Sequence, residues 1–207
     1  TVEIQPDGTY SLQESDVFDA VNSFDNCDIT QVNFPATTYT CDDVYQSFPV
    51  GLTISDAAGN TDDCTANIYV EIGTALPPQW STADIGMNAF GNAYSFDPCT
   101  APNPEDGEFT ITGSGNNGFN PTQDAIAFAH QNVCGDFTLT AKMESVDPNG
   151  YGGLMAREST APGAKQYSLF SNLTNTLLVQ IRTVTNGPKQ QQLHSRPYPI
   201  WLRLQRM

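Results

Sequence analysis

Short runs of alternating apolar and polar residues recur along the chain, and they restrict its fold more than any other feature. Val50, Leu52 and Ile54 alternate with glycine or polar residues. The same period of two returns over residues 64–72, 137–144, 177–182 and 200–205. Successive side chains of a strand point to opposite faces of its sheet, so this period indicates half-buried strands. Gly, Pro and Asn clusters separate the runs, as turns require. The sequence therefore predicts an all-β protein.

A short extended segment divides the chain in two. Residues 74–79, Thr-Ala-Leu-Pro-Pro-Gln, are typical of a linker. Before it, two alternating runs surround an Ala-Ala-Gly-Asn turn at 57–60, which predicts a hairpin. We expect a small immunoglobulin-like sandwich over 1–73. A larger antiparallel sandwich is expected over 80–207.

The charge of the chain is strongly one-sided. There are 23 acidic residues against 8 basic ones, a net charge of −15, and every Lys and Arg lies after residue 141. Nucleic-acid binding needs basic side chains that displace counterions from phosphates, so this class of partner is excluded. No run of 18 apolar residues exists, and we expect no membrane insertion.

The five cysteines indicate structural disulfides. Cys27, Cys41, Cys64, Cys99 and Cys134 lie far apart, and no C-x-x-C pair suggests a zinc or thioredoxin-type site. Wide spacing in β-rich sequence favours an oxidising, extracellular compartment. We predict the pairs Cys27–Cys41 and Cys99–Cys134, because each pair is local to its own domain. Cys64 is left over.

Residues 1–72 resemble the hyalin-repeat-like, immunoglobulin-like modules of giant secreted surface proteins of Bacteroidota. The matching stretches are Thr-Val-Glu-Ile-Gln-Pro-Asp-Gly at 1–8, Phe-Asp-Asn-Cys-Asp-Ile at 24–29, Tyr-Thr-Cys at 39–41, and 52–66. Such modules carry a further Cys just before the first strand, paired with the Cys that opens the last one. The resemblance implies that Cys64 is the residue whose partner lies outside this chain.

Residues 80–207 resemble the concanavalin-like sandwich modules of bacterial surface proteins and carbohydrate-active enzymes. The stretches that carry the resemblance are 80–86, 109–115, 135–142, Gly-Gly-Leu-Met-Ala-Arg-Glu-Ser at 152–159, and Trp-Leu-Arg-Leu at 201–204. Modules of this kind continue with several more strands. The two resemblances together imply an all-β chain truncated at both ends, a piece of a longer polypeptide.

Acidic and amide side chains in the turns are candidate calcium ligands, because calcium takes six to eight hard oxygens. The candidates are Asp16, Asp19, Asp25, Asp28, Asp56, Asn60 and Asp62 in the first domain, and Asp84, Asp106 and Asp136 in the second. The alternative is turn chemistry, since Asp and Asn side chains bond to nearby backbone and tolerate left-handed conformations. The spacing matches no EF-hand, so both interpretations stay open.

Exposed aromatic side chains would serve sugar binding. Trp80, Tyr151, Tyr167 and Trp201 are candidates for stacking on pyranose rings. Trp201 alternates against Ile200 and Leu202, which predicts that it faces away from the core. Core packing is the competing interpretation for each aromatic.

The sequence contains no recognisable catalytic motif, and we expect no enzyme. It has no nucleophile elbow, no phosphate-binding loop and no H-E-x-x-H. The leading hypothesis is a structural and adhesive segment of a large secreted or cell-surface bacterial protein. Its partners would be neighbouring domains, neighbouring surface molecules or a polysaccharide. The alternatives are a carbohydrate-binding accessory region of a secreted hydrolase and a subunit of an extracellular filament.

Overall fold

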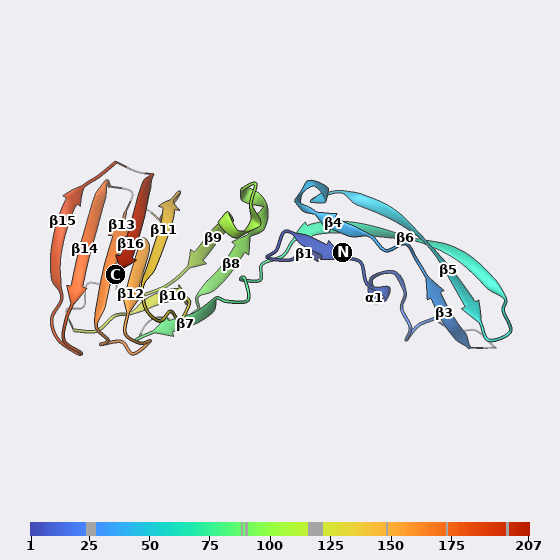
Figure 1. Ribbon diagram of the computed structural model, residues 1–207, viewed down its shortest axis with the longest axis horizontal. Coiled ribbons are helices and arrows are strands. Elements are labelled where there is room, and N and C mark those ends of the chain that lie inside the picture. The colour runs from blue at the N-terminus through green and yellow to red at the C-terminus, as the bar shows by residue number, and fades with distance from the viewer. Residues whose placement is uncertain are drawn as a thin grey trace. The chain divides into compact units, whose positions relative to one another are not determined.

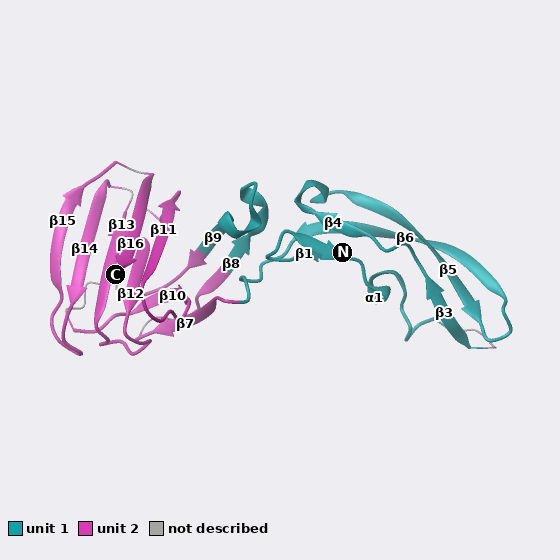
Figure 2. Cartoon of the chain, viewed as in Figure 1, with its two compact units in different colours: residues 1–78, 95–110 teal, residues 79–94, 111–207 magenta. Residues whose placement is uncertain are grey.

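The chain is all-β, as the sequence predicted (Figure 1). The computed structural model describes residues 1–23, 28–87, 89, 91–115, 122–147, 149–172, 174–197 and 199–207. These residues form several sheets and one short α-helix, α1 (Glu14–Val17). Contacts between Cα atoms divide the chain into two compact units (Figure 2). The first unit holds residues 1–78 and 95–110, and the second holds 79–94 and 111–207.

The first unit is built around a four-stranded sheet. Its order is β1 (Val2–Ile4), β6 (Thr61–Ile72), β5 (Ser47–Asp56) and β3 (Ile29–Asn33). Strand β1 runs parallel to β6, whereas the other pairs are antiparallel. The expected hairpin is confirmed as β5 and β6, and the Asp56 backbone N–H closes it by donating to the Asn60 carbonyl over 3.0 Å.

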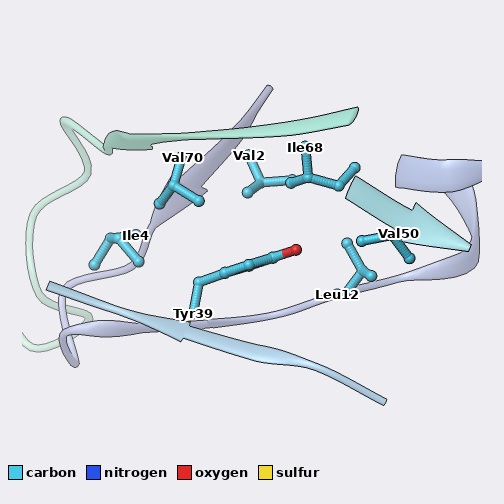
Figure 3. Packing of buried hydrophobic residues seen from close by; sticks show 7 residues of the cluster. All are labelled: Val2, Ile4, Leu12, Tyr39, Val50, Ile68 and Val70. Carbon is cyan, nitrogen blue, oxygen red and sulfur yellow. The ribbon is translucent and has the colours of Figure 1, made fainter. Parts of the chain in front are cut away.

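A second ladder covers one face of this sheet. Strands β2 (Thr9–Ser11) and β4 (Thr38–Thr40) pair with each other, and Tyr39 of β4 is 3% exposed. Its ring packs on Phe48 at 5.2 Å between centroids. The buried cluster drawn in Figure 3 consists of Val2, Ile4, Leu12, Tyr39, Val50, Ile68 and Val70. Its members alternate along β1 and β6, so the two-residue period sets which face of the sheet becomes the core.

Residues 95–110 belong to the first unit, although the sequence interpretation assigned everything from residue 80 to the second domain. Strands β8 (Ala93–Asp97) and β9 (Glu108–Thr112) pair here. Between them lie two short 3-10 helices, η2 (Pro98–Thr100) and η3 (Pro104–Asp106). Cys99 in η2 packs against the core of the first unit. The chain therefore leaves the first unit, returns to it for one hairpin and leaves again.

The second unit contains a four-stranded antiparallel sheet and two strand pairs. The sheet runs β12 (Gly152–Arg157), β13 (Gln166–Ser171), β14 (Thr176–Arg182) and β15 (Gln190–Ser195). The pairs are β7 (Ser81–Ile85) with β10 (Ile126–His130), and β11 (Phe137–Met143) with β16 (Ile200–Arg206).

Strand β16 shows the alternation expected from its sequence. Leu202 and Leu204 are 2% and 4% exposed, whereas Trp201 between them is 68% exposed. In the sheet β12–β15 burial does not separate apolar from polar residues, because its buried positions include polar side chains. Ser168 of β13 and Gln180 of β14 lie opposite each other, and both are fully buried.

Candidate functional site

The structure contains a disulfide that corrects both predicted pairs. Cys41 and Cys99 are bonded across a sequence separation of 58 residues, with 5.3 Å between their Cα atoms. Cys41 therefore does not pair with Cys27, which lies outside the described residues, and Cys99 does not pair with Cys134. Cys134 and Cys64 are free and exposed. The prediction failed because it assumed that Cys99 belongs to the second domain.

Close backbone packing accompanies this bridge. Gly8 has a φ of +81°, and a Cβ atom there would come within 2.6 Å of Pro104 and 3.7 Å of Cys41 Sγ. The turn after β1 is thus tight enough to need glycine. It brings the η3 segment and the disulfide against the same part of the first unit. The bridge joins Cys99, between β8 and β9, to Cys41, which follows β4 in the short 3-10 helix η1 (Cys41–Asp43).

Six of the acidic side chains proposed as calcium ligands accept hydrogen bonds from other residues of the chain. Asp56 is 7% exposed, and it accepts hydrogen bonds from the backbone and side-chain N–H groups of Asn60 at 2.8 and 2.6 Å. These bonds, with the Asn60 side chain first, lower the pKa of Asp56. Asp84 accepts from Asn92 Nδ2 at 2.6 Å and from the Tyr94 hydroxyl at 2.9 Å.

The remaining candidates follow the same pattern. Asp16 accepts from the Gln13 backbone at 2.8 Å and from the Tyr10 hydroxyl at 2.9 Å. Burial, followed by this bond to Asp16, raises the pKa of Tyr10 to about 12. Asp19 accepts from the Asn22 side chain at 2.6 Å, which lowers the pKa of Asp19. Asp62 accepts from the Asp63 backbone at 3.0 Å, and Asp106 accepts from Asn103 at 3.2 Å.

Two further candidates, Asp28 and Asp136, are exposed, and Asp28 has a left-handed φ of 56°. Asp25 lies outside the described residues. Over the described part of the chain, no group of three or more His, Cys, Asp or Glu side chains is arranged to hold a metal ion. Asp16, Asp19, Asp56, Asp62 and Asp106 bond to residues close in sequence, as turn chemistry predicts. Asp84 instead bonds to Asn92 and Tyr94.

The candidate sugar-binding aromatics lie on separate elements. Trp201 is on β16 and Tyr167 is on β13, where it is 41% exposed. Trp80 directly precedes β7 and Tyr151 directly precedes β12, and both are half-buried. Trp201 therefore offers the largest exposed fraction of the four.

The site that sequence reasoning missed is a buried carboxylate surrounded by cations. Asp124, 2% exposed, precedes β10. Arg182, at the end of β14, donates from Nη1 to Asp124 Oδ2 at 2.9 Å and from Nη2 to Oδ1 at 3.0 Å. Lys189 Nζ lies 2.9 Å from Oδ1, and Arg157 Nη1 lies 3.4 Å from Oδ2. All four side chains are at most 3% exposed, so three cations share one anion away from water.

Backbone carbonyls and an aromatic ring satisfy the guanidinium groups further. Arg182 Nη1 also donates to the carbonyl of Ala164 at 3.0 Å, and Arg157 donates to those of Ser159 and Ala161, each at 2.6 Å. The Arg157 guanidinium lies 5.8 Å from the centroid of the Phe128 ring, a cation–π contact. The loops at one end of the sheet β12–β15 are thereby tied to the strand pair β7–β10.

Burial and charge act against each other in this cluster, called the Asp124 cluster below. Burial alone would raise the pKa of Asp124, but bonds to Arg182 and Lys189 outweigh it and hold that pKa below its usual value. Burial lowers the pKa of Lys189 and of Arg157, and the Asp124 charge opposes this effect. Gly86 permits the arrangement, because a Cβ there would lie 2.0 Å from the Asp124 carbonyl oxygen. The cluster is a structural element that holds the second unit together.

The stretch 152–159, which carries part of the concanavalin-like resemblance, contains one residue of the Asp124 cluster, Arg157. Arg157 and Glu158 are neighbours in this stretch, but they have different partners. Arg157 faces the buried Asp124, whereas Glu158 meets Lys165 at 3.4 Å on the surface. β12 ends at Arg157, and Glu158 lies just beyond it.

Comparison with protein-family models, curated proteins and solved structures gives no match to this chain. Among the described residues, no helix is both long and apolar enough to span a bilayer.

Proposed function

We propose that this chain is a non-catalytic structural and adhesive segment of a large secreted or cell-surface bacterial protein. The first unit would be an immunoglobulin-like spacer and the second a concanavalin-like recognition unit, in the order that the sequence resemblances imply. The observation that carries the proposal is the Cys41–Cys99 bridge. Disulfides of this kind persist outside the reducing cytosol, so the bridge supports an extracellular location.

The position of the bridge supports a spacer function. Strands β5 and β6, residues 47–72, lie inside the covalent loop that Cys41 and Cys99 close. A force applied through residues 1 and 207 passes across the disulfide and bypasses this hairpin. The longest strands of the first unit therefore keep their pairing while the ends of the chain carry tension.

The free cysteines supply the test of location. Cys134 is exposed and free, so a maleimide that does not cross membranes should label it on intact cells that make the full parent protein. Cys64 is free in this chain, but the resemblance places its partner elsewhere in the parent protein, where Cys64 should be labelled only after reduction. Cys41 and Cys99 should be labelled only after reduction. Mass spectrometry of the peptides distinguishes the four sites. Labelling of all four only after the cells are lysed, without a reductant, would place the chain in the cytosol and contradict the proposal.

A carbohydrate-binding accessory region of a secreted hydrolase is the second candidate function. The observation that favours it is the 68% exposure of Trp201, because a planar, solvent-facing indole is suited to stacking on a sugar ring. Both candidates place the second unit in contact with an extracellular polymer. They differ in what the neighbouring domains do.

A further inference from the structure

The outer face of the strand pair β11–β16 combines an exposed indole with basic side chains. The register places Lys142 directly opposite Trp201, and Thr140 opposite Arg203. All four are exposed. Directly opposed residues of an antiparallel pair have Cβ atoms about 5 Å apart, and residues two apart along a strand lie about 7 Å apart. Lys142 and Arg203 thus flank the indole on one surface, called the Trp201 face below.

The basic residues are unevenly distributed between buried and exposed sites. Arg157, Arg182 and Lys189 are buried in ion pairs with Asp124. Five bases stay exposed, and three of these belong to the pair β11–β16: Lys142, Arg203 and Arg206. The exposed positive charge of the whole molecule is therefore concentrated on two neighbouring strands.

The acidic residues are concentrated elsewhere. The first unit carries 17 of the 23 acids and no base, and the second carries the remaining six acids and all eight bases. One of those six, Asp124, is buried in the cluster, so five exposed acids balance five exposed bases on the second unit. Charges beyond about 10 Å are screened at physiological salt, so the local charge of the Trp201 face decides which ions it attracts.

The Trp201 face already holds a carboxylate. Lys142 Nζ forms an ion pair with Glu144 Oε1 two residues along the strand, and both side chains are partly exposed. The Arg203 guanidinium donates to Gln205 Oε1 at 3.3 Å, a neutral partner. Its capacity for a two-point bond to a carboxylate is thus left for a ligand.

We propose that the Trp201 face binds an acidic polysaccharide, with one pyranose ring stacked on Trp201 and ring carboxylates bound by Arg203 and Lys142. Stacking and charge act together here, because a uronic acid carries its carboxylate at the edge of the ring that the indole covers. The inference rests on the proposed adhesive function and names its ligand class. Neutral sugars would use the indole but leave the Arg203 guanidinium with only its neutral partner, Gln205.

The test uses the whole 207-residue chain and a short oligogalacturonate, titrated by calorimetry at low and at physiological salt. We expect saturable binding that weakens with salt, and binding about tenfold weaker or worse in Trp201→Ala. Arg203→Gln and Lys142→Gln should each weaken binding and reduce its salt dependence. The matched controls are Tyr45→Ala, an aromatic 67% exposed in the first unit, and Lys165→Gln, an exposed base away from β11 and β16. Neither control should change the affinity.

Several results would overturn the inference. Equal binding of the methyl-esterified oligomer would show that the carboxylates are not recognised. Full binding by Trp201→Ala, with an unchanged thermal melt, would place the ligand elsewhere. Concentration-dependent self-association that Trp201→Ala abolishes would assign the face to a second copy of the chain. If no oligomer binds while the cysteines label as an extracellular protein requires, the ligand is wrong and the proposed function stands. Cytosolic labelling would remove the proposed function itself.

Discussion

Asp124 and Arg182 form a two-point ion pair, at 2.9 and 3.0 Å, with both side chains at most 1% exposed. The two residues are 58 positions apart in sequence: Asp124 lies in the loop before β10, and Arg182 is the last residue of β14. A buried bidentate pair of this kind is strongly directional, so it sets how the loop before β10 meets the end of β14. The pair stabilises only while both partners are present, because either charge alone would be desolvated.

We predict that Asp124→Asn destabilises the second unit by about 3–5 kcal/mol, since it leaves three buried cations without a carboxylate. Chemical denaturation of the full chain measures the change. Glu158→Gln is the matched control, because it breaks an ion pair at 3.4 Å whose side chains are about half exposed. Such pairs contribute little. Equal effects of the two variants would contradict the structural role of the cluster.

The acid limb of the stability curve should depend on the same carboxylate. The folded pKa of Asp124 lies below its unfolded value of about 3.9, so its stabilisation is complete above that pH and is lost as the pH falls through the folded pKa. The stability difference between the wild-type chain and Asp124→Asn should therefore shrink below about pH 4. A difference that stays constant from neutral to strongly acidic pH would show that the Asp124 charge is not responsible.

Removal of the disulfide should destabilise the first unit, which holds both cysteines. Closing a loop of 58 residues restricts the unfolded chain by about 4 kcal/mol in the chain-entropy description. Cys41→Ser with Cys99→Ser is the test, followed by thermal melting of the full chain. Cys64→Ser and Cys134→Ser remove exposed free thiols and should have almost no effect. A larger loss from either control than from the double variant would contradict the assigned pairing.

Salt should stabilise the first unit more than the second. The first unit carries 17 acids without a base, so self-repulsion opposes its folding and added salt screens that repulsion. Two thermal transitions, assigned by the disulfide variants, would report the units separately. Calcium binding by the candidate carboxylates of the first domain would require more: millimolar calcium must raise the first transition beyond sodium chloride at equal ionic strength. Equal effects of the two salts would leave screening alone and contradict bound calcium.

Local pattern predicted the strands better than it predicted their partners. The period of two identified β5, β6, β11, β14 and β16 as strands. β14 is the exception in burial, because its Leu178, Gln180 and Arg182 are buried and its other residues are half-buried. Strand β15, Gln-Gln-Gln-Leu-His-Ser, is exposed along its length and has no such pattern, so only its pairing with β14 makes it a strand.

The disulfide and the Asp124 cluster were missed for a common physical reason. Both join residues 58 positions apart, and no local property of a sequence reports a contact at that separation. Asp124 lies between Gln123 and Ala125 with nothing to mark it as buried. Trp201 was assigned to the outer face correctly because its own strand supplies the alternation. That Lys142 lies opposite Trp201 follows from the register of β11 and β16, which only the structure provides.

The spacer function depends most directly on the Cys41–Cys99 bridge, and single-molecule extension tests it. When the chain is pulled from residues 1 and 207, the bridge withholds 58 residues from the extended length, about 200 Å. We predict that the fully unfolded oxidised chain is shorter by this amount than the reduced chain or the Cys41→Ser, Cys99→Ser double variant. Equal final lengths for the oxidised and reduced chains would show that no covalent loop spans β5 and β6, and would contradict the account of a stapled extracellular spacer.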